Sequence, residues 1–283
     1  MKEEQHKGWR LISSRPSPGA SHMALDQALL ENAARSDFPP TLRFYRWSPP
    51  AISIGRFQDL ADVDRAACSV NGVEIVRRPT GGKCILHEKD FTYSLVLPAS
   101  FSLPRSVIEA YSIICGGILS ALGRIGLAAA IQTRRNEDYR QVQGACFSAV
   151  TQADLEWNGL KLCGSAQVRR MGALLQHGSI LLEDRSQELF SLLRFPDEEQ
   201  RKQALETYRS RCASLDQTGL VVSWQELADS LLKGFEERFG VAIEPGVLTA
   251  EERRRWSELT VSYASTSWLQ NAASGSFPED AGG

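Results

Sequence analysis

The order of hydrophobic and polar residues along the chain switches repeatedly between the two-residue period of β-strands and the longer period of α-helices. Short apolar or alternating runs predict strands at about 9–13, 42–47, 51–55, 73–78, 83–87, 91–97, 149–157, 161–167 and 173–182. Asn158-Gly159, between two of these runs, is typical of a hairpin turn. The pattern therefore predicts a sheet that is rich in hairpins.

Apolar stripes at helical spacing predict helices between and after these strands. The strongest helix is expected to open at Pro104, and its stripe contains Val107, Ile108, Tyr111, Ile114, Cys115, Ile118, Leu119 and Leu122. Further helices are expected at about 21–34, capped by Ser21, at 62–70, at 224–239, capped by Ser223, and at 250–259. We therefore expect an α+β fold, a mixed or antiparallel sheet flanked by helices, with a short helical C-terminal extension.

The change of character along the chain suggests its organisation. We expect an N-terminal tail at 1–8, one main domain at 9–220 and the helical extension at 221–264. From about 265 to 283 the residues are small and polar, which predicts a disordered tail.

Composition and charge exclude several classes of protein. The chain has 32 basic and 34 acidic residues, a net charge of -2, without the basic excess of most nucleic-acid-binding proteins. Arg134-Arg135 and Arg169-Arg170 could bind an acidic protein partner or simply be exposed charges. The N-terminus lacks the apolar region of a signal peptide, and no apolar run approaches the ~18 residues of a membrane span. We therefore expect a cytoplasmic protein without a nucleic-acid or membrane partner.

Six cysteines are scattered along the chain without a C-x-x-C pair, so no metal site is expected. At least five of them should be small buried residues. Cys146 differs in context, because Gly144-Ala145-Cys146-Phe147-Ser148 follows a polar stretch. Exposure beside a cation would make Cys146 a reactive thiolate, although a lone cysteine is more often structural.

Residues 77–87, Arg-Arg-Pro-Thr-Gly-Gly-Lys-Cys-Ile-Leu-His, form a second segment of interest. Its two adjacent glycines would let a ligand approach the backbone, and successive N–H groups there can hold an oxyanion. Taken alone, a Gly-Gly pair between strands is usually just a hairpin turn.

Lys161 begins an otherwise apolar strand, and Gln176-His177-Gly178-Ser179-Ile180 follows it. A lysine at a strand end is usually solvated. In a dry pocket it would lower the pKa of a neighbouring thiol and could itself serve as a base. His177 is an alternative base, and Cys163 is interpreted as a packing residue.

Together, and in this order, these segments resemble the ligand-pocket motifs of the biotin/lipoate protein ligase and lipoyl(octanoyl)transferase superfamily. The resemblance rests on the Arg-Arg-x-Thr-Gly-Gly run ending in histidine, on Lys-x-x-Gly-Ser-Ala and on His-Gly-Ser, and it covers about residues 9–240. Residues 53–58, Ser-Ile-Gly-Arg-Phe-Gln, are similar to the family's early strand and turn. The resemblance implies the class II aminoacyl-tRNA-synthetase-like biotin/lipoate ligase fold, with the catalytic domain at 9–220.

Within the superfamily the chain is most similar to the LipM-type octanoyltransferases of lipoate biosynthesis. This implies transfer of octanoyl from acyl carrier protein to Cys146 as a thioester, assisted by Lys161, and then to a lysine of a lipoyl-domain protein such as the glycine cleavage H protein. No cofactor or metal is implied. The implied substrate-binding residues are Arg77, Thr80, Gly81, Gly82, His87, Gly164, Ser165, Ala166, His177 and Gly178.

Other members of the superfamily are ligases that activate a free acid with ATP and need no cysteine. Ligases typically have a third glycine where this chain has Lys83. The chain also has only a short C-terminal part where many ligases carry an accessory domain, although some keep that domain on another chain. An ATP-dependent lipoate ligase, an octanoyl amidotransferase between lipoyl domains and a non-catalytic carrier-protein binder remain the alternatives.

Overall fold

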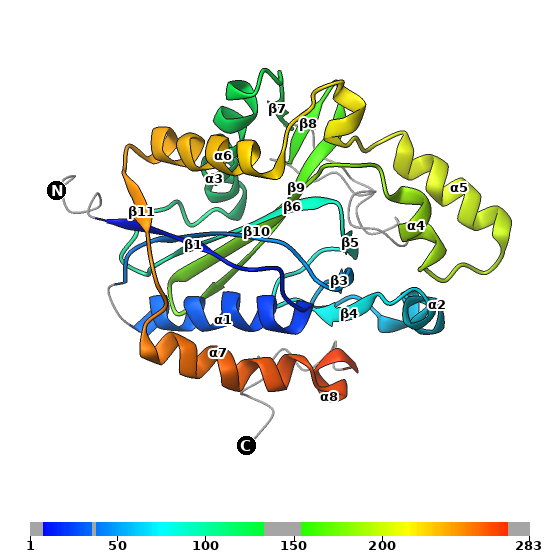
Figure 1. Cartoon of the computed structure of the whole chain (residues 1–283), viewed down its shortest axis with the longest axis horizontal. Coiled ribbons are helices and arrows are strands. Elements are labelled where there is room, and N and C mark those ends of the chain that lie inside the picture. The colour runs from blue at the N-terminus through cyan, green and yellow to red at the C-terminus, as the bar shows by residue number, and fades with distance from the viewer. Residues whose placement is uncertain (1–7, 36–37, 133–153, 271–283) are drawn as a thin grey trace.

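The computed structural model describes residues 8–35, 38–132 and 154–270. Within these residues the larger sheet has eight strands in the order β11-β1-β2-β6-β10-β9-β8-β7 (Figure 1). Their bounds are Ile243–Pro245, Trp9–Ser13, Thr41–Tyr45, Asp90–Leu97, Ala173–Leu181, Leu160–Arg170, Leu155–Trp157 and Ala130–Ile131 in that order. β1 pairs in parallel with β11 and β2, and the other neighbouring pairs are antiparallel. The sheet is therefore mixed, as the sequence predicts.

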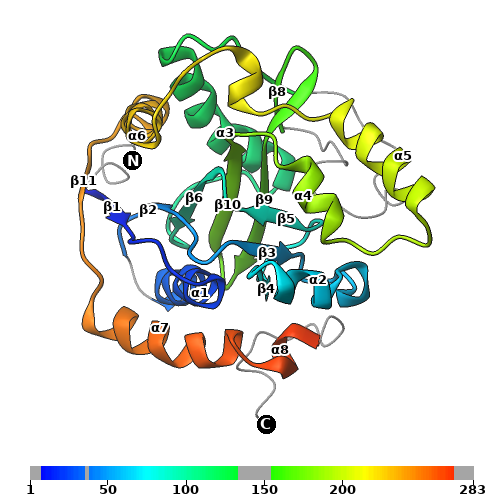
Figure 2. The ribbon, with the colours of Figure 1, turned by 45° about the vertical axis from the view of Figure 1, so that its right-hand side comes forward.

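A smaller sheet, β4-β3-β5, lies beside the first and is formed by Glu74–Arg77, Ala51–Ile54 and Ile85–His87. Three short helices pack near it: α2 (Arg65–Val70), α4 (Ser186–Ser191) and α5 (Glu198–Arg209) (Figure 2). Apolar residues of these helices and of β3 and β5 form a core of their own. The domain thus has two sheets, and the space between them is available for a ligand.

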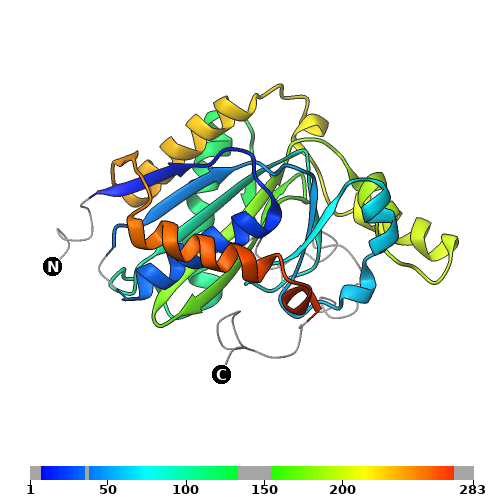
Figure 3. The ribbon, with the colours of Figure 1, turned by 60° about the horizontal axis from the view of Figure 1, so that its bottom comes forward.

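Helices cover both faces of the larger sheet. α1 (Gly19–Arg35) packs on one face and is itself covered by α7 (Ala250–Tyr263), as Figure 3 shows from below. On the other face lie α3 (Val107–Arg124) and α6 (Trp224–Phe239). Leu227, Leu231 and Phe235 of α6 are buried in the main core, so this C-terminal helix is part of the packed domain.

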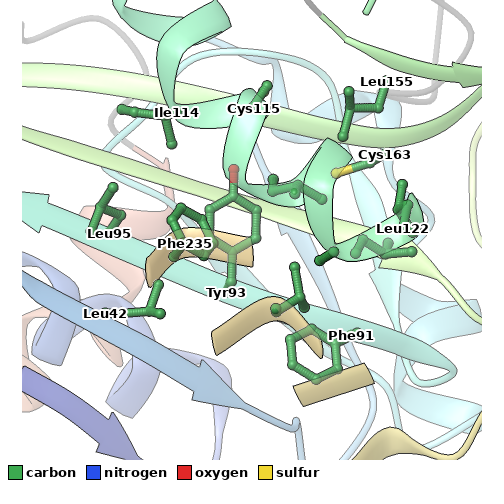
Figure 4. Packing of buried hydrophobic residues seen from close by; sticks show 14 of the residues in the cluster. Leu42, Phe91, Tyr93, Leu95, Ile114, Cys115, Leu122, Leu155, Cys163 and Phe235 are labelled. Atoms are coloured by element: carbon green, nitrogen blue, oxygen red, sulfur yellow. The ribbon is translucent and has the colours of Figure 1, made fainter. Parts of the chain in front are cut away.

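Strand β6 is buried along its whole length, and its two faces have different chemistry. Phe91, Tyr93 and Leu95 belong to the main core with α3 and α6 (Figure 4). Thr92 and Ser94 alternate with them and therefore lie on the opposite face, the one that α1 covers. A polar face that would normally be solvated is thus enclosed.

Helix α3 crosses α6 closely because two glycines meet at the crossing. A Cβ atom added to Gly234 would lie 2.3 Å from the Gly117 carbonyl oxygen. Among the described helices, α3 alone is long and apolar enough by composition to cross a membrane. The apolar stripe of α3 packs into the main core, which accounts for its composition.

Several helix boundaries differ from the prediction. Helix α1 begins at Gly19, whose N–H donates to the Glu74 carboxylate at 3.0 Å, so Ser21 is not its cap. Helix α3 begins after Ser106, whose hydroxyl accepts from the Glu109 N–H, and Pro104 lies outside the helix. In both cases the residue that satisfies the first free N–H groups decides where the helix starts.

The C-terminal region also differs from the expectation of disorder from 265 onward. Thr266–Gln270 forms helix α8, and Trp268 is buried. The Trp268 indole donates to the Arg77 carbonyl at 3.0 Å, packs edge-on against Tyr263 and lies under the Arg56 guanidinium. Trp268, together with the hydrogen bonds from the Arg77 guanidinium to the Leu269 carbonyl, thus anchors this short polar segment.

Candidate active site

A pocket lies where the two sheets and α1 meet, with an empty volume of about 400 Å³ that is partly open to solvent. Its walls come from α1, β2, β3, β5, β6, β9 and β10. The lining residues are Met23, Tyr45, Trp47, Ser53, Arg78, Ile85, His87, Thr92, Gly164, Ser165, Ala166, His177, Gly178 and Ser179. Apolar and polar groups are therefore both available to a ligand, as in most small-molecule sites.

The exposure of the lining residues differs from one wall to another. Met23 and Tyr45 are each 1% exposed and belong to an apolar cluster that includes residues of α1 and α7. Residues 164–166 and Gly178 are only partly buried. The pocket therefore has a more accessible border on β9 and β10 and buried apolar side chains on the α1 and β2 side, which suits a ligand with a hydrophobic chain.

The Gly81-Gly82 turn borders the pocket region and is held by arginines. Gly82 has a positive φ of 95°, and its carbonyl oxygen lies so close to Gly55 that a Cβ atom there would be 1.8 Å away. Arg78 donates to the carbonyls of Ser53, Gly81 and Lys83 at 2.6–3.2 Å. The turn is therefore a rigid piece of backbone rather than an adjustable loop.

Arg77 does not line the pocket. Its guanidinium donates to the carbonyls of Gly55, Arg56 and Gln58 and to that of Leu269, at 2.7–3.0 Å. Arg77 thus fastens β4 to the preceding loop and to α8. The neighbouring Arg78, which the sequence did not single out, is the arginine that reaches the pocket.

His177 connects the turn to a buried ion pair. Its Nε2 lies 2.6 Å from the Thr80 hydroxyl and its Nδ1 lies 3.1 Å from the Asp26 carboxylate. Asp26 is fully buried, forms an ion pair with Arg43 and accepts from the Ser94 hydroxyl at 2.7 Å. Because Asp26 can only accept when ionised, Nδ1 carries a proton and Nε2 accepts from Thr80.

Burial and ion pairing fix the charge states of this group. Burial lowers the pKa of His177 below its ordinary value, against the opposing effect of Asp26, so the imidazole is neutral near pH 7. Burial opposes ionisation of Asp26, but the Arg43 guanidinium and the hydrogen bonds from His177 and Ser94 bring the pKa of Asp26 below its ordinary value. The result is a neutral imidazole held in one orientation by an anionic carboxylate.

His87 is held in a similar way on the other side of the pocket. Its Nδ1 lies 2.7 Å from the Asp90 carboxylate and its Nε2 lies 2.8 Å from the Ser53 hydroxyl. The Trp47 ring stacks on the imidazole with the ring centroids 3.9 Å apart, and its indole donates to Thr92 at 2.8 Å. This wall of the pocket is therefore rigid as well.

Lys161 is buried on β9 and forms a 2.9 Å ion pair with Asp154. The pocket lining includes Gly164, Ser165 and Ala166 of the same strand but not Lys161 itself. Lys161 is therefore not a solvated lysine at a strand end. It also does not line the pocket itself. Cys146, the other residue expected to be catalytic, lies outside the described residues.

The five described cysteines, Cys68, Cys84, Cys115, Cys163 and Cys212, are all buried, as predicted. Cys115 and Cys163 lie within the main core (Figure 4). Burial raises the pKa of Cys163 to about 12 and that of Cys68 to about 11, and it raises the pKa of Cys115 well above its ordinary value. These thiols are poor nucleophiles, because the thiolate is the reactive form.

Of the other residues expected to bind substrate, the structure brings His87, His177, Gly178 and residues 164–166 together around one pocket. Thr80 adjoins it through His177, while Gly81 and Gly82 form the supporting turn. Sequence reasoning missed Asp26, although a carboxylate at helical spacing within an apolar stripe was a usable signal. Among the residues that the structure describes, no group of three or more His, Cys, Asp or Glu side chains could hold a metal ion.

Solved structures share this fold over nearly the whole chain. A bi-partite lipoate protein ligase of Thermoplasma acidophilum superposes with a TM-score of 0.81 at 25% identity, covering 96% of this chain and 99% of that one. A lipoate-protein ligase A bound with ATP superposes with a TM-score of 0.79 at 23% identity, covering 94% of this chain and 100% of that one. The fold is thus that of lipoate protein ligases.

Sequence comparison narrows this class. The family described as the lipoyl protein ligase A/B catalytic domain matches residues 18–236, and the chain belongs to that family. Curated relatives include octanoyltransferase LipM of Kyrpidia tusciae, 40% identical over 268 residues, and of Geobacillus kaustophilus, 39% identical over 269 residues. Each alignment covers 92% of this chain and 97% of the relative. The superfamily and the fold predicted from the motifs are confirmed, and so is the prediction of an acyltransferase.

Proposed function

We propose that this chain is an octanoyltransferase of lipoate biosynthesis, in which Cys146 carries the octanoyl group and Lys161 assists. The observation that carries the proposal is the pocket, with buried apolar side chains at Met23 and Tyr45 and a more accessible border at residues 164–166 and Gly178. Such a pocket suits a medium-length acyl chain with a reactive carbonyl at the border. The curated relatives named octanoyltransferase LipM support the same activity.

The proposed nucleophile follows from the chemistry of the cysteines. Five of the six are buried, and burial raises the pKa of Cys68, Cys115 and Cys163. A thiolate nucleophile needs a lowered pKa, so these positions are poorly suited to catalysis. Cys146 is the remaining cysteine of the chain, and Lys161 is the proposed cation beside it.

In the first half-reaction the Cys146 thiolate attacks the octanoyl thioester of the donor. The bond between the acyl carbon and Cys146 Sγ forms, the bond to the donor sulfur breaks, and the leaving thiolate takes a proton from the Lys161 ammonium. In the second half the acceptor lysine amine attacks this thioester, loses a proton to the now neutral Lys161 and releases the Cys146 thiolate. Exchange between similar thioesters is nearly balanced, so the first half-reaction does not require ATP.

The donor we propose is octanoyl acyl carrier protein, and the acceptor is a lysine of a lipoyl-domain protein such as the glycine cleavage H protein, in the cytoplasm. The archaeal ligase that shares the fold is described together with its E2 lipoyl domain, which supports an acceptor of this class. Arg77, Thr80, Gly81 and Gly82 would keep the turn in place, while His87, His177, Gly178 and residues 164–166 would contact the acyl group.

Intact-mass measurement after incubation with octanoyl acyl carrier protein tests the proposal. The wild-type chain should gain the mass of one octanoyl group, and Cys146→Ala should not. Cys68→Ala, which changes a buried cysteine of the small-sheet core, is the matched control and should still gain it. An unmodified wild-type chain, or an adduct that persists in Cys146→Ala, would contradict the cysteine mechanism.

An ATP-dependent lipoate ligase is the second candidate, because the fold is shared with a lipoate-protein ligase A that binds ATP. This activity would use free lipoate and ATP and would survive Cys146→Ala. An amidotransferase would accept octanoyl from an octanoylated lipoyl domain instead of the carrier protein. Exchanging the donors in the same mass assay separates these possibilities, and a non-catalytic carrier binder would leave Cys146 unmodified with every donor.

A further inference from the structure

Lys161 is part of a continuous hydrogen-bonded chain that ends at the pocket. Its ammonium lies 2.9 Å from one oxygen of Asp154, and the Tyr111 hydroxyl lies 2.7 Å from the other oxygen. The same hydroxyl accepts the backbone N–H of Ser165 at 2.9 Å. The Ser165 carbonyl is a second acceptor at 3.2 Å, but the Asp154 carboxylate is nearer and charged, so the single hydroxyl proton goes to Asp154. Three contacts thus join the ammonium to a residue that lines the pocket.

We propose that Asp154 is the positioning residue of Lys161, and that Tyr111 couples this ion pair to the pocket wall at Ser165. The proposal rests on the proposed function, in which Lys161 gives and takes the proton of the transfer. Asp154 keeps the ammonium charged and in one orientation. Tyr111 fixes the position of Ser165 at the pocket border relative to the Asp154–Lys161 pair.

The burial of the pair gives Asp154 this role rather than that of an incidental surface contact. The side chains of Lys161 and Asp154 are 3% and 1% exposed. A lysine is a point charge on a flexible stem, and burial without a counter-charge favours its neutral form. Asp154 restores the charged form, and the fixed carboxylate limits where the ammonium can lie.

Tyr111 is suited to hold Asp154 because it cannot ionise near neutral pH. Burial, and next the nearby Asp154 carboxylate, raise the pKa of Tyr111 well above its ordinary value, so its hydroxyl keeps the proton it donates. Its other contact fixes Ser165, since β8 pairs with β9 only up to Leu155 and Cys163 in the described residues. The Ser165 N–H is thereby satisfied by Tyr111 and is not free to bind an oxyanion.

Other titratable groups near the pair would shape any pH dependence. They are Glu156, the register partner of Lys161 on β8, and Tyr111, Cys163, Cys115 and Tyr93. Burial raises the pKa of Cys163, Cys115 and Tyr93, so these three groups stay protonated and uncharged near neutral pH. Of the two carboxylates, Glu156 accepts from the Gln132 amide at 2.8 Å, and Asp154 lies 2.9 Å from the Lys161 ammonium, so Asp154 is the one placed to set its charge.

The pH profile of acyl transfer to Cys146 tests the positioning role. The alkaline limb reports loss of the Lys161 proton, and Asp154→Asn should move it to lower pH by about 1–3 units, the effect of one close opposite charge. Asp154→Glu, which keeps the negative charge, should leave the alkaline limb close to its wild-type position. In the Lys161→Ala background Asp154→Asn should cost nothing further, because the group it positions is already absent.

A rate that falls by one factor at every pH, or an equal loss in the Lys161→Ala background, would show that Asp154 is merely structural and would overturn the proposal. Tyr111→Phe should raise KM for the octanoyl donor with the alkaline limb unmoved, and an unchanged KM would overturn the coupling to Ser165. An NMR titration of the Lys161 ammonium in wild type and Asp154→Asn needs no substrate. If the wild type fails to acylate, the proposed function fails, while an unshifted titration refutes the positioning role by itself.

Discussion

Replacing Asp26 by asparagine should destabilise the protein strongly, because the carboxylate is the centre of a buried polar network. Its two oxygens accept hydrogen bonds from Arg43, Ser94, Tyr45 and His177, and both members of the Asp26–Arg43 ion pair are fully buried. Asparagine keeps one accepting oxygen and places an NH₂ group, itself a donor, against two of these donors. The substitution also leaves the Arg43 charge buried without its partner.

Breaking a buried ion pair by removing one partner costs about 3–5 kcal/mol. This is a large part of the roughly 5–15 kcal/mol that stabilises a typical domain. At about 2–4 °C per kcal/mol, we expect Tm to fall by roughly 6–20 °C. Thermal unfolding followed by circular dichroism measures this, with Glu183→Gln as the control, because the Lys89–Glu183 pair is about half exposed and should contribute about 1 kcal/mol at most.

The pH dependence gives an independent check of the same network. The pKa of Asp26 is lower in the folded protein than its ordinary value, so its contribution is complete above the unfolded-state pKa of about 3.9 and is lost as pH falls through the folded-state pKa. The difference in stability between wild type and Asp26→Asn should therefore be constant near neutral pH and shrink below about pH 5. A loss under about 1 kcal/mol, or a difference that does not depend on pH, would refute this account.

Three further outcomes are expected. Gly234→Ala should lower Tm by several degrees, since the new Cβ would lie 2.3 Å from the Gly117 carbonyl oxygen; an unchanged Tm would mean that α3 and α6 can separate freely. Gly178→Ala should reduce kcat/KM for acyl transfer at least tenfold, because the new Cβ would lie 2.3 Å from the Ser165 hydroxyl at the pocket border. A kcat/KM at the wild-type level would show that Gly178 does not contribute to the site. Cys163 should resist iodoacetamide in the native protein and react after denaturation, given its burial and a pKa of about 12; rapid native labelling, read by peptide mass, would contradict its place in the core.

The sequence by itself determined most elements and the type of pocket. Hydrophobic periodicity located the strands and the core helices, because apolar residues must face a common interior whatever the topology. The motif residues His87 and His177 were identified through the resemblance to the superfamily's ligand-pocket motifs, and both line the pocket. Local signals also predicted the Ser223 cap of α6, where a side chain and its backbone partner are only three residues apart.

Only the tertiary structure decided which polar residues serve the site. Asp26 is far in sequence from His177, and only the packing of α1 on the sheet brings the two side chains together. Asp154 is close in sequence to Lys161, but it contacts the ammonium only because the β8–β9 hairpin folds back on itself. The polar residues Thr92 and Ser94 of β6 are also buried only because α1 packs on that face of the sheet. The start of α1 was likewise set by Glu74 from another strand. Such contacts depend on how distant segments pack, because a buried charge is stable only when the fold brings a partner within hydrogen-bonding distance.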